Sequence, residues 1–284
     1  MINLFNDSRK QSAFTLIELL VVVAVLALLA SIVFSNLTGA REQAKISNAL
    51  SFQSNMHNLL GADLVGWWNF DEGSGSVAND LSGYGNNGTI VGATRVDGVP
   101  GTGGKAMDVS KGNHYIRLGP SNSILSDNVW TLSGWFNASQ IDDSVYPNRI
   151  ITFHKATGSP SANTGASLLV GDLSQAKLMY AKSGGSQAYL IHTDIETDRW
   201  YHFVGSYDGE TYRSYINGGD MKSVKSTFDG FGAAEAMIGT YSTGSYFFNG
   251  LIDDVRIYSR ALTAYEVQTL YAQTKDKYLS EKID

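Results

Sequence analysis

Carboxylate, hydroxyl and amide oxygens gather in one glycine-rich stretch, Asp80-Leu81-Ser82-Gly83-Tyr84-Gly85-Asn86. Calcium binds about six to eight hard oxygens, and the side chains of Asp80, Ser82 and Asn86 with flexible backbone carbonyls can supply several of them. Aspartate and asparagine are also frequent in glycine-rich turns that hold no ion, because their side chains bond to nearby backbone. The stretch therefore predicts either a calcium-binding loop or a hydrogen-bonded turn.

A single acid, Glu18, stands at the start of an otherwise apolar run. Residues 19–30 read LLVVVAVLALLA, without a polar side-chain atom, and apolar residues continue as far as Phe34. A carboxylate beside hydrocarbon costs roughly 2.5 kcal/mol or more on membrane-insertion scales, so we expect Glu18 to have a partner. After Leu60 no apolar stretch approaches the ~20 residues that a membrane span needs, so the sequence predicts one N-terminal membrane segment.

Residues 12–30, SAFTLIELLVVVAVLALLA, resemble the class III signal of type IV prepilins and pseudopilins. The resemblance implies that a prepilin peptidase cuts between Ala13 and Phe14, methylates the new amino terminus and leaves Glu18 at the fifth mature position. The family usually has glycine where this chain has Ala13, and many major pilins carry a proline near the place of Ser35. In an assembled filament, the α-amino group of Phe14 would pair with Glu18 of a neighbouring subunit.

Two plainer interpretations of this N-terminus are a membrane anchor with a spacer helix and an ordinary cleaved secretory signal. A small-x-small cleavage site is missing at the end of the apolar run, because Leu28 and Leu29 stand two residues before Ala30 and Ser31. A plain anchor explains neither Glu18 nor the order Phe-Thr-Leu-Ile-Glu after a small residue.

Behind the apolar run the pattern becomes amphipathic, with apolar residues three and four apart between charged ones. These positions are Leu37, Ala40, Ala44, Ile46, Leu50, Met56, Leu59 and Leu60. The spacing predicts a continued helix with one packing stripe. A single helix from Phe14 to Leu60 would be roughly 70 Å long at 1.5 Å per residue, so its second half must dock on a domain outside the membrane.

Composition fits a folded protein and excludes several classes. The chain of 284 residues is 43% hydrophobic and 17% charged, and it has room for about one or two domains. Its net charge of −6 argues against a nucleic-acid partner, because such binding relies on clustered positive charge. The absence of cysteine excludes disulfides and thiolate-bound metals.

Beyond residue 63 the chain predicts many short strands. Thirty glycines against 4 prolines indicate tight turns, and residues 64–70 alternate aromatic and polar side chains. Further strand candidates share this short, β-branched or aromatic character: 89–91, 115–118, 130–136, 149–153, 167–170, 176–181, 200–207, 211–216, 236–238 and 250–258. Such a series predicts an antiparallel sandwich or jelly roll.

Two local signals are sharper than the strand pattern. Asn217-Gly218 predicts a two-residue hairpin turn, because both residues accept positive φ. Thr263 with Glu266 at capping-box spacing predicts the start of a short helix over residues 263–271.

Five blocks between Leu64 and Ala272 are similar, in order, to laminin-G-like jelly rolls of the concanavalin A type. They are residues 68–75 with 80–88, 130–136, 199–209, 215–218 and 248–262. The resemblance implies that calcium-binding members use the aspartate and asparagine of the glycine-rich loop with an aspartate of the Ile-Asp-Asp-Val strand. In this chain those residues are Asp80, Asn86 and Asp253, with Asp71 and Ser82 as further candidates. Function does not follow from the fold, which hosts lectins, adhesion modules and hydrolases alike.

The chain carries no intact hydrolase pattern. The best-known hydrolases of this fold have Glu-x-Asp-x-x-Glu on one strand, since retaining cleavage needs two carboxyls about 5–5.5 Å apart. The nearest stretch begins at Glu196 and Asp198, and Tyr201 takes the third place. The adjacent pairs Asp71-Glu72 and Asp253-Asp254 would point to opposite faces of a strand. The 5 histidines show no metal-ligand spacing, and no nucleophile elbow or phosphate loop occurs.

Exposed aromatic rings are a further feature of the sequence that suits a ligand site. Tyr84, Tyr146, Tyr189, Tyr241 and Tyr246 lie in or near predicted loops, where contact with a sugar or a protein is plausible. The sequence does not distinguish which of these tyrosines face outward.

The resulting prediction is an α+β chain in which a long N-terminal helix precedes an antiparallel β-sandwich. Its parts are a leader peptide (1–13), a pilin-like helix (14–61), a laminin-G-like sandwich (62–273) and a polar tail that frays (274–284). We expect a minor pilin or pseudopilin of a type IV pilus or a type II secretion-like filament. Its lectin-like or adhesive head would carry structural calcium and no catalytic residue.

The expected partners and location follow from this prediction. The precursor would cross the cytoplasmic membrane once with its C-terminal head outside, meet the prepilin peptidase, and join copies of itself or other pilins. The filament would stand at the cell surface or in the periplasm, and the head would contact a glycan or protein and no nucleic acid. The alternatives are a carbohydrate-active enzyme tethered to the membrane or pilus, and a pseudopilin whose head contacts exported cargo.

Overall fold

The computed structural model describes residues 16–17, 19–29, 60–99, 104–126, 128–141, 148–154, 165–171, 174–181, 187–228, 230–241 and 246–279. The chain divides into two compact units, Met1–Asn58 and Leu59–Asp284.

In the first unit, residues 16–17 and 19–29 are helical, and their large apolar side chains are exposed. Within the part of the chain that the structure describes, no helix is both long and apolar enough to cross a membrane. Ala13, Phe14 and Glu18 lie outside the described residues, as does the amphipathic stretch before Leu60. A single long helix therefore stays a prediction.

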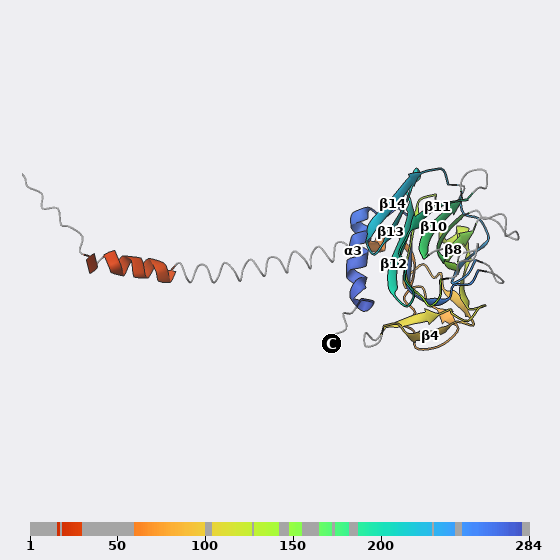
Figure 1. The fold of residues 1–284 in the computed structure, drawn as a ribbon, viewed down its shortest axis with the longest axis horizontal. Coiled ribbons are helices and arrows are strands. Elements are labelled where there is room, and N and C mark those ends of the chain that lie inside the picture. Colours follow the sequence, from red (N-terminus) through yellow and green to blue (C-terminus); the bar gives the residue numbers. More distant parts are fainter. Residues whose placement is uncertain are drawn as a thin grey trace, which may run out of the picture. The chain divides into compact units, whose positions relative to one another are not determined.

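The second unit is an antiparallel β-sandwich of two 8-stranded sheets (Figure 1). Sheet A has the order β14-β13-β12-β7-β16-β5-β4, with β1 also paired to β16. Its strands are β1 (Leu64–Trp68), β4 (Thr94–Asp97), β5 (Lys105–Asp108), β7 (Trp130–Ala138), β12 (Trp200–Tyr207), β13 (Thr211–Ile216), β14 (Gly219–Lys225) and β16 (Gly250–Tyr258).

Sheet B has the order β11-β10-β9-β8-β15-β6-β3-β2. Its strands are β2 (Val77–Ala78), β3 (Gly88–Val91), β6 (Tyr115–Pro120), β8 (Asn148–His154), β9 (Gly165–Gly171), β10 (Gln175–Ala181), β11 (Gln187–His192) and β15 (Glu235–Ile238). A short helix, α2 (Ser121–Ile124), follows β6.

The hydrophobic core lies between the two sheets. Sheet A contributes Leu132 and Phe136, and sheet B contributes Leu168 and Leu178, all without exposed surface. Side chains alternate between the two faces of a strand, so each sheet also has an outer face that points away from this core.

The C-terminal segment covers part of the outer face of sheet A. Helix α3 (Ala264–Thr274) is followed by a 3-10 turn (η1, Lys275–Lys277), and α3 runs beside β12 and β13 (Figure 1). Tyr278 is buried, and its ring stacks on Trp135 with 4.1 Å between centroids. The predicted boundary of a fraying tail at residue 274 is therefore wrong for residues 275–279, because an aromatic residue near the end packs onto the sheet.

The local signals of the sequence are confirmed. Asn217 (φ 51°) and Gly218 (φ 71°) form the hairpin turn between β13 and β14. Thr263 and Glu266 form a reciprocal capping box at the start of α3. Strand β14 was not predicted, because nearly all of its residues are exposed and Val224 is its only β-branched or aromatic residue.

Candidate ligand-binding site

Asp80 organises the glycine-rich loop through its carboxylate. One oxygen accepts hydrogen bonds from the backbone N–H groups of Trp67 and Ser82, each at 2.9 Å. The other accepts from the Ser82 hydroxyl at 2.8 Å and from the Asn86 N–H at 2.9 Å. Asn86 in turn donates its side-chain amide to the carbonyl of Val65 at 2.7 Å. The structure thus brings Asp80, Ser82 and Asn86 together, and their polar atoms fix the loop.

Asp253 lies instead under the C-terminal segment, on the outer face of sheet A. Its buried carboxylate accepts a hydrogen bond from the Tyr278 hydroxyl at 2.8 Å and pairs with Lys277 at 2.9 Å. Burial raises the pKa of Asp253 to about 7, and Lys277 opposes that shift. Asp71 accepts from the Lys105 N–H at 2.6 Å.

These contacts favour the turn interpretation of the glycine-rich loop, because the carboxylates face N–H and O–H donors. Among the described side chains, no group of three or more histidine, aspartate or glutamate residues is placed to hold a metal ion. Calcium at Asp80, Asn86 and Asp253 stays a prediction.

The stretch nearest to a hydrolase pattern forms a turn before β12. Glu196 is exposed and pairs with Arg199 at 3.1 Å, and Asp198 has a positive φ of 57°. Tyr201 is buried, and its hydroxyl accepts a hydrogen bond from the Glu196 N–H at 3.1 Å. The predicted absence of catalytic residues stays a prediction.

A hydrogen-bond chain with the order of a nucleophilic triad joins Ser214, His192 and Asp220. The His192 ring contacts the Ser214 hydroxyl at 2.9 Å through Nε2 and the Asp220 carboxylate at 2.8 Å through Nδ1. Ser214 has no exposed surface and His192 is 1% exposed, so a substrate does not reach them. His192 belongs to sheet B and its two partners to sheet A, so these hydrogen bonds link the edges of the two sheets.

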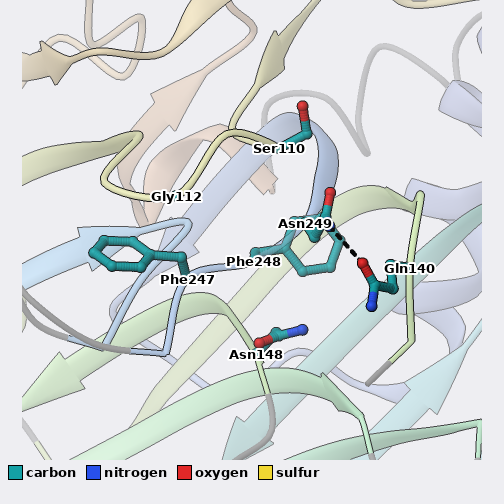
Figure 2. Close-up of a pocket in the computed structure, with 7 residues that line it drawn as sticks. All are labelled: Ser110, Gly112, Gln140, Asn148, Phe247, Phe248 and Asn249. Carbon is teal, nitrogen blue, oxygen red and sulfur yellow. Dashed lines mark hydrogen bonds between the residues drawn. The ribbon is translucent and has the colours of Figure 1, made fainter.

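A small polar hollow lies where the loops after β5 and β7 meet the starts of β8 and β16 (Figure 2). Its volume is about 190 Å³, and it is lined by Ser110, Gly112, Gln140, Asn148, Phe247, Phe248 and Asn249. Asn249 donates a hydrogen bond to Gln140 at 3.1 Å, and the Phe247 ring stands at one side (Figure 2). Amides beside an aromatic ring suit the hydroxyl groups and the apolar face of one sugar ring.

Sequence reasoning missed this hollow, because its residues come from segments far apart in the chain. The available signal was the turn at Asn249-Gly250, where an amide follows two phenylalanines.

The predicted loop tyrosines separate into exposed and covered groups. Tyr84 is 63% exposed and Tyr189 40% exposed, whereas Tyr241 is buried. Tyr246 is half-buried and packs edge-on against Tyr241 at 5.6 Å, and Tyr146 lies outside the described residues.

Two family models match the chain, one within the sandwich and one at the N-terminus. The model of the concanavalin A-like lectin/glucanases superfamily matches residues 110–268, which is more than half of the chain. The model of the prokaryotic N-terminal methylation motif matches residues 8–34.

Among curated proteins, the chain is similar to the type II secretion system core protein G of Aeromonas hydrophila. The two are 44% identical over 54 residues, which are 19% of this chain and 38% of that protein. The chain thus matches well under half of its curated relative.

Among solved structures, domain 4 of AbnA, a GH43 extracellular arabinanase from Geobacillus stearothermophilus in complex with arabinotriose, is 26% identical with a TM-score of 0.55. The match covers 74% of this chain and 98% of that domain. The binding domain of Paraclostridial Mosquitocidal Protein 1 is 20% identical with a TM-score of 0.59, over 75% of this chain and 53% of that one. A Trypanosoma rangeli sialidase mutant is 16% identical with a TM-score of 0.57, over 76% of this chain and 33% of that one.

Proposed function

The chain belongs to the concanavalin A-like lectin/glucanases superfamily, and from this premise we propose that it is a pilin-like subunit with a lectin-like head. The N-terminal unit would anchor and assemble the subunit, and the sandwich would present a carbohydrate-binding surface outside the membrane. The subunit would belong to a type IV pilus or a type II secretion-like filament, as a minor component.

The filament part of the proposal is supported by the N-terminus. The methylation motif spans residues 8–34, and the matched secretion protein is named a core protein of the type II system. In the helical residues, the described large apolar side chains are between 48% (Val22) and 80% (Leu16) exposed. A surface of this kind needs lipid or other helices to cover it. The precursor would therefore sit in the cytoplasmic membrane and then pack against copies of itself or other pilins.

The lectin part is supported by the sandwich. The arabinanase domain, at 26% identity, is described in complex with arabinotriose, so a related domain holds an oligosaccharide. In this chain the hollow beside Phe247 offers amide donors and acceptors from Gln140, Asn148 and Asn249 for sugar hydroxyls. Its volume of about 190 Å³ is below the roughly 300–1,000 Å³ of drug-sized pockets, which suits a single sugar ring.

The observation that carries the proposal is the N-terminal methylation motif, so the test addresses processing. Mass spectrometry of the assembled protein should find an N-methylated Phe14 at the mature terminus. Glu18→Ala should be cut in the same way yet enter filaments poorly, because the buried amino group loses its acid. Assembled protein that still begins at Met1, or normal filaments from Glu18→Ala, would contradict the proposal.

A carbohydrate-active enzyme on the same anchor is the second candidate, because the family description includes glucanases. Release of reducing sugar from oligosaccharides that the head binds distinguishes the two. The lectin proposal expects binding without release, and turnover that survives purification to homogeneity would favour the enzyme.

A further inference from the structure

The segment that precedes β16 forms one wall of the hollow and is held in place from two sides. The Asn249 carbonyl accepts a hydrogen bond from the Ser139 N–H at 2.9 Å, and the Gly250 carbonyl accepts one from the Val109 N–H at 3.0 Å. Phe248, which precedes Asn249, is 1% exposed and belongs to the core. This wall is therefore fixed before a ligand arrives, which lowers the entropy cost of binding.

Two amide side chains at the hollow bind each other and keep further hydrogen-bonding capacity. The Asn249 Nδ2 group donates to Gln140 Oε1 at 3.1 Å. An amide carries one carbonyl oxygen and two N–H donors, so the Asn249 oxygen can still accept and the Gln140 NH2 group can still donate. If both amides are flipped the roles exchange, and one acceptor and one donor group remain in either case. An acceptor beside a donor suits two neighbouring hydroxyls of one sugar ring.

Phe247 supplies the apolar wall of the hollow. Its ring is half-buried and packs against the Tyr115 ring, with 6.4 Å between the centroids. Figure 2 shows the Phe247 ring on one side and the amides of Gln140, Asn148 and Asn249 on the other. A sugar ring in this place would lay its C–H face on the phenyl ring and turn its hydroxyls toward the amides.

Among the described residues that line the hollow, none is ionisable. Ser110 contacts an acid, Asp108, and satisfies it from within the chain, because the Ser110 hydroxyl and N–H both donate to one carboxylate oxygen, at 2.5 and 2.9 Å. The polar groups that the hollow offers to a ligand are therefore neutral.

The cation beside Asn148 in the chain, Arg149, does not line the hollow. Adjacent residues of a strand point to opposite faces, and the Arg149 guanidinium lies over the Tyr241 ring, with 5.3 Å from Cζ to the centroid. The register of β8 against β9 shifts between Arg149 and Ile151, and this β-bulge turns both Ile150 and Ile151 to the core while Arg149 keeps the outer face. A charged ligand would thus find no counter-ion among the described lining residues.

We propose that the hollow binds an uncharged sugar ring and selects against acidic sugars. Gln140 and Asn249 would hold two neighbouring hydroxyls, and Phe247 would cover the apolar face of the ring. A carboxylate placed in the hollow would lose part of its hydration without gaining an opposite charge, which is costly. The assignment deepens the proposed function and rests on its premise that the head binds saccharides.

The test is isothermal titration of the full-length chain in detergent with three oligosaccharides. Arabinotriose and galactotriose are the neutral probes and distinguish a pentose from a hexose, and trigalacturonate is the acidic counterpart of galactotriose. We expect one of the neutral probes to bind, and trigalacturonate to bind at least about tenfold more weakly than that probe.

Two variants assign the binding to the hollow. Phe247→Ala should weaken binding of the neutral probe about tenfold, because the sugar loses the ring on which it packs. Gln140→Lys places a cation at the hollow and should raise the affinity for trigalacturonate relative to the neutral probe. Gln268→Lys, at an exposed position of α3, is the matched control and should leave that ratio unchanged.

Three results would overturn the inference while a lectin-like head still stands. They are trigalacturonate binding as tightly as the neutral probe, equal ratios in Gln140→Lys and Gln268→Lys, and unchanged affinity in a Phe247→Ala chain that is folded by tryptophan fluorescence. Failure of all three probes to bind would overturn it as well, and the N-methylated Phe14 tests the pilin-like role independently.

Discussion

The outer faces of the two sheets differ in the partners of their buried charged side chains. On sheet A, Asp253 lies under the C-terminal segment and is held by Lys277 and Tyr278. On sheet B, Arg149 is equally buried and no described acid pairs with it. Unpartnered hydroxyls occur on both faces, including those of Tyr215 and Ser167, so the faces differ in whether a described residue of opposite charge pairs with the buried charge.

The difference indicates that the chain itself balances the buried charge on the outer face of sheet A, whereas no described acid balances that of Arg149 on sheet B. Trp135 on the outer face of sheet A stacks on Tyr278 and donates a hydrogen bond to Thr274 at 3.0 Å. Local arrangements that cost stability without an internal compensation concentrate at functional sites. We therefore expect removal of a buried charge to change stability in opposite directions on the two faces.

Removal of the Tyr278 ring should have the largest effect. Tyr278→Ala should lower the free energy of unfolding by about 3–5 kcal/mol, since it deletes a buried aromatic ring and leaves Asp253 without its hydroxyl donor. Tyr189→Ala, on the outer face of sheet B, should cost less than about 1 kcal/mol because its ring is partly exposed. Urea unfolding of the full chain in detergent, followed by fluorescence, measures the head alone, because all 5 tryptophans lie in the sandwich.

Acid should destabilise the head through His202, which is fully buried on the outer face of sheet A and contacts Ser133 at 2.9 Å. Burial lowers the pKa of His202 to about 3. The unfolded chain therefore binds a proton that the folded chain does not, so this contribution is present above about pH 6.5 and is lost as pH falls. The loss should reach about 3 kcal/mol at pH 4.

His202→Gln removes the titrating group, so the free energy of unfolding should change less between pH 7 and pH 4 than in the unchanged chain. His192 also has a pKa lowered by burial, so its titration adds to the same loss of stability at low pH and persists in His202→Gln. An unchanged pH dependence in His202→Gln would contradict the assignment.

Replacement of a buried charged residue by methionine should change the free energy of unfolding in opposite directions on the two faces. Arg149→Met should raise the free energy of unfolding by about 1–3 kcal/mol, because an apolar side chain replaces a buried charge with which no described acid pairs. Lys277→Met should lower it, because Asp253 would stay buried without its cation. A loss of stability in Arg149→Met would mean that the guanidinium already has a compensating partner.

The smallest effect concerns the start of the helix that covers sheet A. Thr263→Ala should cost about 1 kcal/mol, because the Glu266 N–H loses the side-chain oxygen that caps it. Thr269→Ala, at an exposed hydroxyl that bonds to its own helix, should change stability little and serves as the control. Equal effects would argue against the capping box.

The sequence predicted those elements whose signals are local. Strands β12, β13 and β16 have the predicted bounds, because large buried residues crowd each of them. The hairpin at Asn217 and the capping box at Thr263 follow from backbone preferences of a few residues. The sandwich class followed from the number of such segments.

The sites could not be predicted in the same way, because they depend on register and distant packing. Arg149 reads as the first residue of a buried strand, and only the bulge after it reveals which face it occupies. The sequence also grouped Asp253 with Asp80, whereas the structure pairs Asp253 with Lys277, a residue assigned to the tail. A change of one residue in register reverses every side chain of a strand, and alternation alone does not detect it.

The most direct test of the two-face comparison is hydrogen–deuterium exchange of the full chain in detergent, with Lys277→Met and Arg149→Met each compared with the unchanged chain. We expect faster exchange in β16 and α3 for Lys277→Met, because Asp253 loses its cation, and unchanged or slower exchange in β8 for Arg149→Met. Faster exchange in β8 for Arg149→Met, or unchanged exchange in β16 and α3 for Lys277→Met, would contradict it.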